Sequence, residues 1–239
     1  MKDIFRKIPY INIFLFFITL ITTLLAGVYM EGGNILSFRD IKLGIPFSFT
    51  LLTILGFHEF GHYFYAKKNK IKVSFPYFIP APTFIGTFGA LIKIKSPITT
   101  KKALLEIGAS GPIAGFVVTI PLLVYGLTKS IVVEIYPNSG IILGEPILMK
   151  FFTFLMFPNL SESQDIILHP IGFASWIGLL ITMLNLLPIG QLDGGHIAYA
   201  IFGKHHHKIS KIVFIFLIPL SFLSLNWILW GVLIIFLMK

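Results

Sequence analysis

The chain alternates long apolar runs with short polar segments, and five of the runs are long enough to cross a bilayer. They cover residues 11–30, 44–66, 103–127, 166–187 and 212–238. An α-helix rises about 1.5 Å per residue, so about 20 apolar residues cross the hydrocarbon core. Pro219 in the last run disrupts the helical hydrogen-bond ladder, so we expect either one kinked helix or two half-length helices there.

Two further apolar stretches are too short or too often interrupted to be predicted as membrane spans. They cover residues 75–94 and 141–157 and contain Pro or Gly. Such segments fit re-entrant or interfacial positions, where protein must shield the polar backbone from lipid. The apolar pattern therefore predicts an all-α polytopic membrane protein with about five or six transmembrane helices. The first run is longer than the core of a signal peptide, so we expect an uncleaved anchor.

Composition supports this fold class and excludes several others. Of the 239 residues, 56% are hydrophobic and 12% are charged, whereas soluble domains have about 45–50% and about 25%. A soluble domain and a disordered chain are excluded. The absence of cysteine rules out disulfides, zinc–thiolate clusters and a cysteine nucleophile, so any metal site must use His, Asp or Glu. Without linkers or repeats, we expect one membrane domain over residues 1–239, with its core at about 45–200 and no separate soluble domain.

The net charge of +9 is unevenly distributed over the loops. Residues 67–102 contain eight lysines and no acid, and residues 203–211 contain three lysines and no acid. Residues 128–165 contain two lysines and four acids. The positive-inside rule then places the basic N-terminus and both lysine-rich loops on the cytoplasmic side. The lysines set orientation and meet anionic lipid rather than nucleic acid, because no aromatic–basic platform accompanies them.

Three ionisable residues interrupt the second apolar run, where ionisable groups are costly. They are His58, Glu59 and His62, in the pattern H-E-x-x-H. Residues i and i+4 lie on one helix face, so two imidazoles can hold one metal ion while the Glu acts as general base. The alternative is a pair of core histidines that hydrogen-bond to a neighbouring helix.

Asp193 is the best candidate for a third metal ligand. A catalytic zinc usually has three protein ligands and one open position. Asp193 follows a helix break at Pro188 and Gly190, and the charge pattern places it at the same depth as the histidines. The alternative for Leu192-Asp-Gly-Gly195 is a plain turn. Glu106 is a weaker alternative ligand.

These residues together resemble the site-2 protease family of intramembrane zinc metalloproteases. The resemblance rests on His58-Glu-Phe-Gly-His62, on Gly108-Ala-Ser-Gly-Pro-Ile-Ala-Gly115, and on Asn185-Leu-Leu-Pro188 followed by Leu192-Asp-Gly194. Residues 73–80 and 86–90 look most like the PDZ-less branch, which includes chloroplast and prokaryotic members.

The resemblance implies one zinc ion per chain, held by His58, His62 and Asp193, with Glu59 as the catalytic base. It implies hydrolysis of a peptide bond within or near the transmembrane segment of another membrane protein. It also implies a membrane-embedded β-like re-entrant loop at about residues 73–95.

The same resemblance assigns substrate binding to Asn185, Gly86 and Gly89. It places the chain in a membrane, which we expect to be a prokaryotic cell membrane, with the N-terminus and the active-site end toward the cytoplasm. The partners are then a transmembrane substrate and the lipid bilayer, with no nucleic acid.

Three other functions compete with this one. A metal transporter would need polar groups spread across the membrane thickness, whereas here they cluster at one depth. A non-proteolytic relative could keep the fold as a scaffold. A zinc protease of another type would take a third ligand Glu from a later helix, and no later run has an internal Glu.

Overall fold

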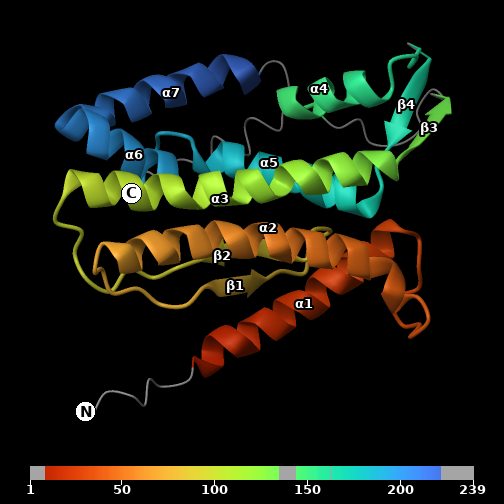
Figure 1. Cartoon of the computed structure of the whole chain (residues 1–239), viewed down its shortest axis with the longest axis horizontal. Helices are drawn as coiled ribbons and strands as arrows, with labels where there is room; N and C mark the ends of the chain where they lie inside the picture. Colours follow the sequence, from red (N-terminus) through yellow and green to blue (C-terminus); the bar gives the residue numbers. More distant parts are fainter. Residues whose placement is uncertain (1–8, 135–143, 162, 222–239) are drawn as a thin grey trace. The chain divides into compact units, whose positions relative to one another are not determined.

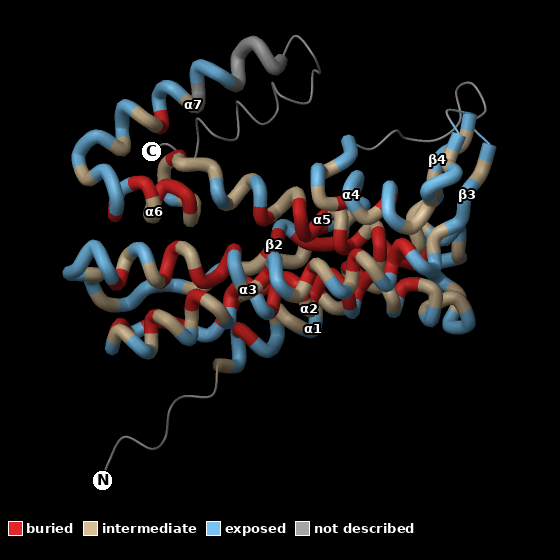
Figure 2. The backbone as a smooth tube through the Cα atoms, turned by 45° about the horizontal axis from the view of Figure 1, so that its top comes forward, coloured by how far each residue is buried: buried red, intermediate tan, exposed pale blue. Residues whose placement is uncertain are grey.

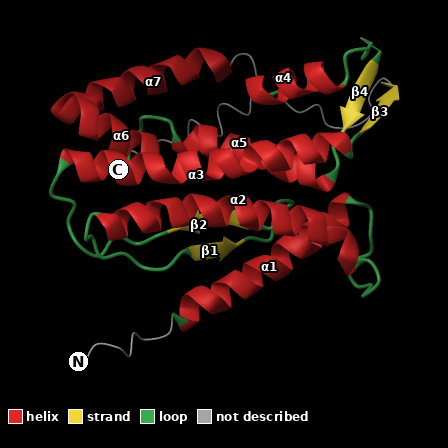
Figure 3. Ribbon diagram, viewed as in Figure 1, coloured by secondary structure: helices red, strands yellow, loops and turns green. Residues whose placement is uncertain are grey.

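The computed structural model describes residues 9–134, 144–161 and 163–221, which are mostly helical with two short hairpins (Figure 3). The helices are α1 (Tyr10–Met30), α2 (Ile41–Lys68), α3 (Lys101–Thr128), α4 (Ile147–Met156), α5 (Pro170–Asn185), α6 (Asp193–Phe202) and α7 (His206–Ser221). A short 3-10 turn, Gly203–His205, joins α6 to α7. The strands are β1 (Tyr77–Pro80), β2 (Thr87–Leu91), β3 (Ile131–Glu134) and β4 (Gln164–Ile167). The helical class predicted from the sequence is confirmed.

Three of the described helices, α1, α2 and α3, are long and apolar enough to cross a membrane. Large apolar side chains remain exposed on α2, among them Phe49 and Phe64, as expected for a surface that faces lipid. The chain is therefore an integral membrane protein. The run at 166–187 gives only the 16-residue helix α5, because β4 takes its start. The last run is helical to Ser221, and the question of one helix or two concerns residues outside the described part.

The described chain forms two compact units. Unit 1 comprises Met1–Phe57, Phe75–Leu91 and Phe116–Leu180, and unit 2 comprises His58–Ser74, Ile92–Gly115 and Ile181–Lys239. Helices α2, α3 and α5 contribute residues to both. Each unit has its own hydrogen bonds and packing.

In unit 1, the first hairpin packs against α1 (Figure 1). Strands β1 and β2 are antiparallel, with Tyr77 opposite Leu91. Asn12 on α1 donates hydrogen bonds to the carbonyls of Phe75 and Pro76, at 2.8 and 2.9 Å. The segment predicted to be β-like thus forms a hairpin, and its depth in the membrane stays a prediction.

The second hairpin of unit 1 lies in the acidic segment expected on the outer side. Its strands β3 and β4 are antiparallel, and Ile131 stands opposite Ile167. Helices α1 and α2 approach closely in the same unit. A Cβ added at Gly27 would lie 2.8 Å from the Cα of Gly44, so these glycines permit the contact.

Unit 2 has a core cluster where the end of α2 meets the start of α3. Its buried members are Ala66, Ile71, Val73, Ala103 and Ile107. Asn69, just beyond α2, donates to the Glu106 carboxylate on α3 at 2.9 Å. Buried stretches run along both helices in Figure 2. This packing fixes the backbone on which the polar cluster of unit 2 is built.

Candidate metal centre

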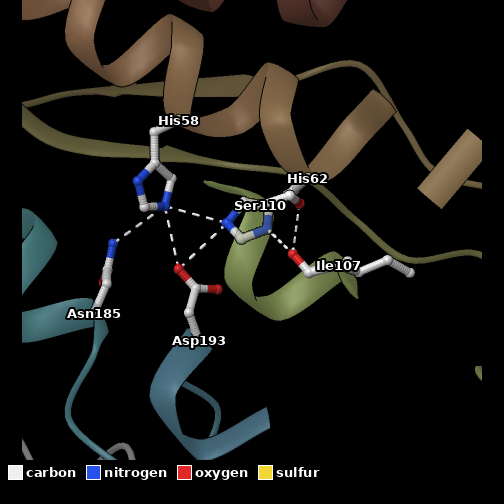
Figure 4. Close-up of polar contacts among 6 residues, drawn as sticks. All are labelled: His58, His62, Ile107, Ser110, Asn185 and Asp193. Atoms are coloured by element: carbon white, nitrogen blue, oxygen red, sulfur yellow. Dashed lines mark hydrogen bonds and ion pairs between the residues drawn. The ribbon is translucent and has the colours of Figure 1, made fainter. Parts of the chain in front are cut away.

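Two imidazoles and one carboxylate converge in unit 2 (Figure 4). His58 and His62 lie one turn apart on α2, and their Nε2 atoms are 3.1 Å from each other. Oδ2 of Asp193, the first residue of α6, lies 3.2 Å from both Nε2 atoms. The structure therefore joins the predicted histidine pair to the predicted third ligand, although Asp193 is 135 residues from His58 in the chain.

The spacing of these three atoms fits one tetrahedral ion. Bonds of about 2.0–2.1 Å from zinc place neighbouring ligand atoms about 3.3 Å apart, close to the 3.1 and 3.2 Å observed. His58, His62 and Asp193 are the one such group of His, Cys, Asp and Glu among the residues that the structure describes. The donor set of two neutral nitrogens and one carboxylate is typical of a catalytic zinc site with an open fourth position.

The charge state of Asp193 suits a metal ligand. Burial raises the pKa of its carboxyl, but the interactions with His58 and His62 outweigh burial and lower the pKa to about 2. The carboxylate is therefore ionised at neutral pH. An ionised oxygen and imidazole nitrogens are the forms that bind a divalent cation.

A backbone carbonyl orients His62. The Ile107 carbonyl on α3 lies 2.7 Å from Nδ1 of His62 and also accepts a hydrogen bond from the Ser110 hydroxyl at 2.8 Å. A carbonyl can only accept, so Nδ1 carries the proton and Nε2 keeps its lone pair for the metal. Sequence reasoning missed Ile107, because any residue type has a backbone carbonyl.

Glu59 lies beside this group but makes no bond to it. Its side chain is buried, and Oε2 has no hydrogen-bond partner among the described residues. The backbone N–H of Ile92 lies within hydrogen-bonding reach of the carboxylate. An unpaired buried carboxylate oxygen is costly, so this oxygen is open to a partner that the described residues do not supply.

Asn185, the last residue of α5, lies near the same group. Nδ2 of Asn185 lies 3.4 Å from Nε2 of His58. A Cβ at Gly194 would overlap the Leu186 carbonyl, so only glycine lets the chain fold back this tightly before α6. Gly86 and Gly89, with φ of 81° and 99°, belong to unit 1, so their role stays a prediction.

Neither Glu106, the alternative ligand considered from the sequence, nor His196 belongs to the metal-ligand group that the described residues form. Glu106 accepts the hydrogen bond from Asn69 and lies 4.0 Å from the Lys102 ammonium, so it does not join the metal group. Burial lowers the pKa of His196, one turn after Asp193 on α6, and its imidazole is neutral at pH 7.

Gly111→Ala is expected to weaken metal binding without unfolding the chain. A Cβ at Gly111 would overlap the imidazole of His62, so the ring must leave its position. We expect zinc affinity to fall about 10-fold or more, as when a group that orients a ligand is lost. Zinc titration of the purified protein in detergent measures this.

The matched control is Gly56→Ala on α2, the helix that carries His62, where the nearest atom, Cζ of Phe78, would be 4.0 Å from the new Cβ. It should bind zinc like the wild type. Unchanged affinity in the Gly111 variant would show that His62 is not a ligand in this position.

Known proteins resemble this chain in sequence over most of its length. Residues 46–225 match the family model of peptidase family M50. The probable zinc metalloprotease EGY2, chloroplastic, of Arabidopsis thaliana is 33% identical over 197 residues, which cover 78% of this chain and 34% of that protein. The probable zinc metalloprotease EGY1, chloroplastic, of the same plant is 33% identical over 174 residues, covering 69% and 31%.

The chain spans about a third of the length of the curated relatives it matches. Among solved structures, it is similar to the site-2 protease from Methanocaldococcus jannaschii. That similarity has a TM-score of 0.47 and 22% identity, and it covers 92% of this chain and 86% of the other.

Proposed function

This chain belongs to peptidase family M50, and from that premise we propose that it is an intramembrane zinc metalloprotease. It would hydrolyse a peptide bond within or near the transmembrane segment of another membrane protein. One observation carries the proposal: the nitrogens of His58 and His62 and an Asp193 oxygen lie 3.1–3.2 Å apart, beside Glu59, whose Oε2 has no hydrogen-bond partner among the described residues. The EGY relatives are named as probable zinc metalloproteases.

His58, His62 and Asp193 would hold the zinc ion, one per chain. When bound, the ion supplies a Lewis acid that acidifies water and polarises a carbonyl. The chain's own contribution is to fix the three donors. Ile107 sets the tautomer of His62, and the turn before α6 sets Asp193 against both imidazoles.

Glu59 is the proposed general base. It would take a proton from the attacking water and deliver it to the leaving amine nitrogen. The free Oε2 supports this role, because a carboxylate oxygen that already accepts two hydrogen bonds would be a poorer base. Asn185, whose amide faces the same group, would orient the substrate by hydrogen bonding.

The substrate must unwind before attack, because helix bonds occupy the carbonyls of a transmembrane segment. A strand edge of the β1–β2 hairpin could hold the unwound segment by β-augmentation. Gly86 and Gly89, at a turn and within β2, are the proposed contact positions.

The finer topology is part of the proposal. We infer one membrane domain with five or six spans, in which the β1–β2 hairpin is the re-entrant loop. The lysine-rich loops support an orientation with the N-terminus and the active-site end toward the cytoplasm. The membrane proposed from the sequence is a prokaryotic cell membrane, whereas the EGY relatives are named as chloroplastic.

Removal of zinc is expected to abolish cleavage. A chelator applied to the purified chain should stop cleavage of a transmembrane model substrate, and stoichiometric zinc should restore it. Magnesium should not, because it prefers oxygen ligands in octahedral geometry. Gel analysis of the substrate and metal analysis of the protein measure both effects. Cleavage that persists in a zinc-free sample would contradict the proposal, and zinc binding without any cleavage would indicate a non-proteolytic relative.

A further inference from the structure

Unit 2 carries a large excess of positive charge on its surface. Its described residues include eleven lysines, and ten of them are exposed. We call all eleven lysines, of which only Lys67 is half-buried, the basic surface. They are Lys67, Lys68, Lys70, Lys72, Lys93, Lys95, Lys101, Lys102, Lys204, Lys208 and Lys211. The described part of unit 2 contains three acidic residues. Glu59 and Asp193 belong to the candidate site, and Glu106 lies 4.0 Å from Lys102. The unit therefore does not neutralise these lysines itself.

The tertiary structure joins lysines from two separate loops into this one surface. The Nζ atom of Lys101, at the start of α3, lies 3.3 Å from the position of a Cβ added at Gly203. Lys101 thus reaches the turn that carries Lys204. In Figure 1 the end of α2, the start of α3 and the α6–α7 connection lie at the same end of the drawing.

Three of these lysines occupy one face of a short antiparallel ribbon. Val73 pairs with Ile94, and the N–H of Lys95 donates to the Lys72 carbonyl at 2.7 Å. Side chains alternate between faces along a strand. Val73 points into the core of unit 2, so Lys72, Lys93 and Lys95 point away from it, and all three are exposed.

This ribbon begins at the proposed catalytic base. The N–H of Ile92 lies within reach of the Glu59 carboxylate, and Lys93 is the next residue. At about 3.3 Å per residue, Lys93 and Lys95 follow the base by roughly 3–10 Å along the strand. Any peptide bound at Glu59 and running along the ribbon therefore passes these lysines within a few residues.

We propose that the basic surface, through Lys72, Lys93 and Lys95, selects substrates that have acidic residues beside the scissile bond. The proposal rests on the proposed protease function. The acidic residues would lie about one to three positions from the cleaved bond, on the side that leaves along the ribbon. Lipid headgroups would also attract lysines, but a headgroup need not pass Glu59, whereas a substrate chain must.

The charge should act on capture of the substrate more than on chemistry. Complementary charges speed encounter and fix register, and salt screens them. At low ionic strength we expect an acidic flank to raise kcat/KM about 10-fold over a neutral flank, mainly through KM. The advantage should shrink as the Debye length falls from about 30 Å at 0.01 M to about 8 Å at 0.15 M.

The test compares one transmembrane substrate carrying three Asp or three Asn in that flank. The variant replaces Lys72, Lys93 and Lys95 with Gln, and the matched control replaces three exposed lysines of unit 1, Lys42, Lys129 and Lys150, with Gln. In neutral detergent, the wild type and the control should prefer the Asp substrate about 10-fold, and the ribbon variant less than about 2-fold. Cleavage of the Asn substrate should be the same in all three proteins.

An undiminished preference in the ribbon variant, or none in the wild type, would overturn the proposal while leaving the protease function intact. The assay is repeated in vesicles of phosphatidylcholine with and without phosphatidylglycerol. If the ribbon variant loses cleavage of both substrates alike, and only with the anionic lipid, the lysines bind the membrane instead. Fluorescence anisotropy of the labelled flank peptides on the Glu59→Gln chain provides the same comparison through binding, so the proposal is tested even if no substrate is cleaved.

Discussion

Glu59→Gln is expected to bind one zinc ion per chain and to lose cleavage. Glutamine keeps the size of the side chain but cannot accept the proton of the attacking water. Loss of a general base costs about 10²–10⁴-fold in rate, so kcat/KM should fall by at least about 100-fold. The metal should stay, because no carboxylate atom of Glu59 belongs to the group formed by His58, His62 and Asp193. Cleavage of a transmembrane substrate and metal analysis of the same sample measure both results.

The matched control is Glu106→Gln, the same change in a carboxylate of unit 2 that bonds to Asn69 outside the metal group. It should cleave like the wild type. If Glu59→Gln retained full proteolysis, Glu59 would have no part in the mechanism. If instead it lost zinc, the carboxylate would act through metal binding rather than as a base.

Asp193→Ala should have the largest effect on zinc content. Removing the carboxylate takes away one of three donors and the negative charge that faces both imidazoles at 3.2 Å. Loss of a group that only supports a ligand costs about 10–100-fold in metal affinity, so loss of the ligand itself should cost more than about 100-fold. Competition with a fluorescent chelator measures the affinity, and cleavage should fall in parallel at limiting zinc.

Asp193→Asn separates ligation from packing at the start of α6. It preserves the shape of the side chain and one acceptor oxygen but removes the charge, so zinc affinity should fall while α6 stays folded. Asp165→Asn is the matched control, since Asp165 is an exposed residue of the β3–β4 hairpin in unit 1. Wild-type affinity in both Asp193 variants would move the third-ligand role to another residue.

The hydrophobic pattern predicted three long helices correctly but overestimated the length of a fourth. The runs at 11–30, 44–66 and 103–127 became α1, α2 and α3, because an unbroken apolar run in lipid must satisfy its own backbone. The run at 166–187 lost its first residues to β4, whose pairing with β3 depends on a partner some 30 residues earlier in the chain. Hydropathy does not record such a partner.

Some residues of the candidate site are placed by local helix geometry, and others are placed by contacts between distant segments. Two histidines four residues apart on a helix share a face, so local geometry is enough to place His58 beside His62. The predictions for Asp193 and Asn185 needed family resemblance and an estimate of membrane depth. Their convergence on His58, within 3.2 and 3.4 Å, follows from the tight turn between α5 and α6.

The sequence by itself determined the membrane class and the histidine pair that can share one metal ion. These follow from composition and from spacings within one helix, which depend on short-range geometry. Only the tertiary structure decided that the Ile107 carbonyl orients His62, that Oε2 of Glu59 has no hydrogen-bond partner among the described residues, and that Lys101 reaches the turn at Gly203. Those features arise from contacts between segments far apart in the chain. The identity of a residue does not reveal which backbone carbonyl it will meet or whether its side chain will lack a partner.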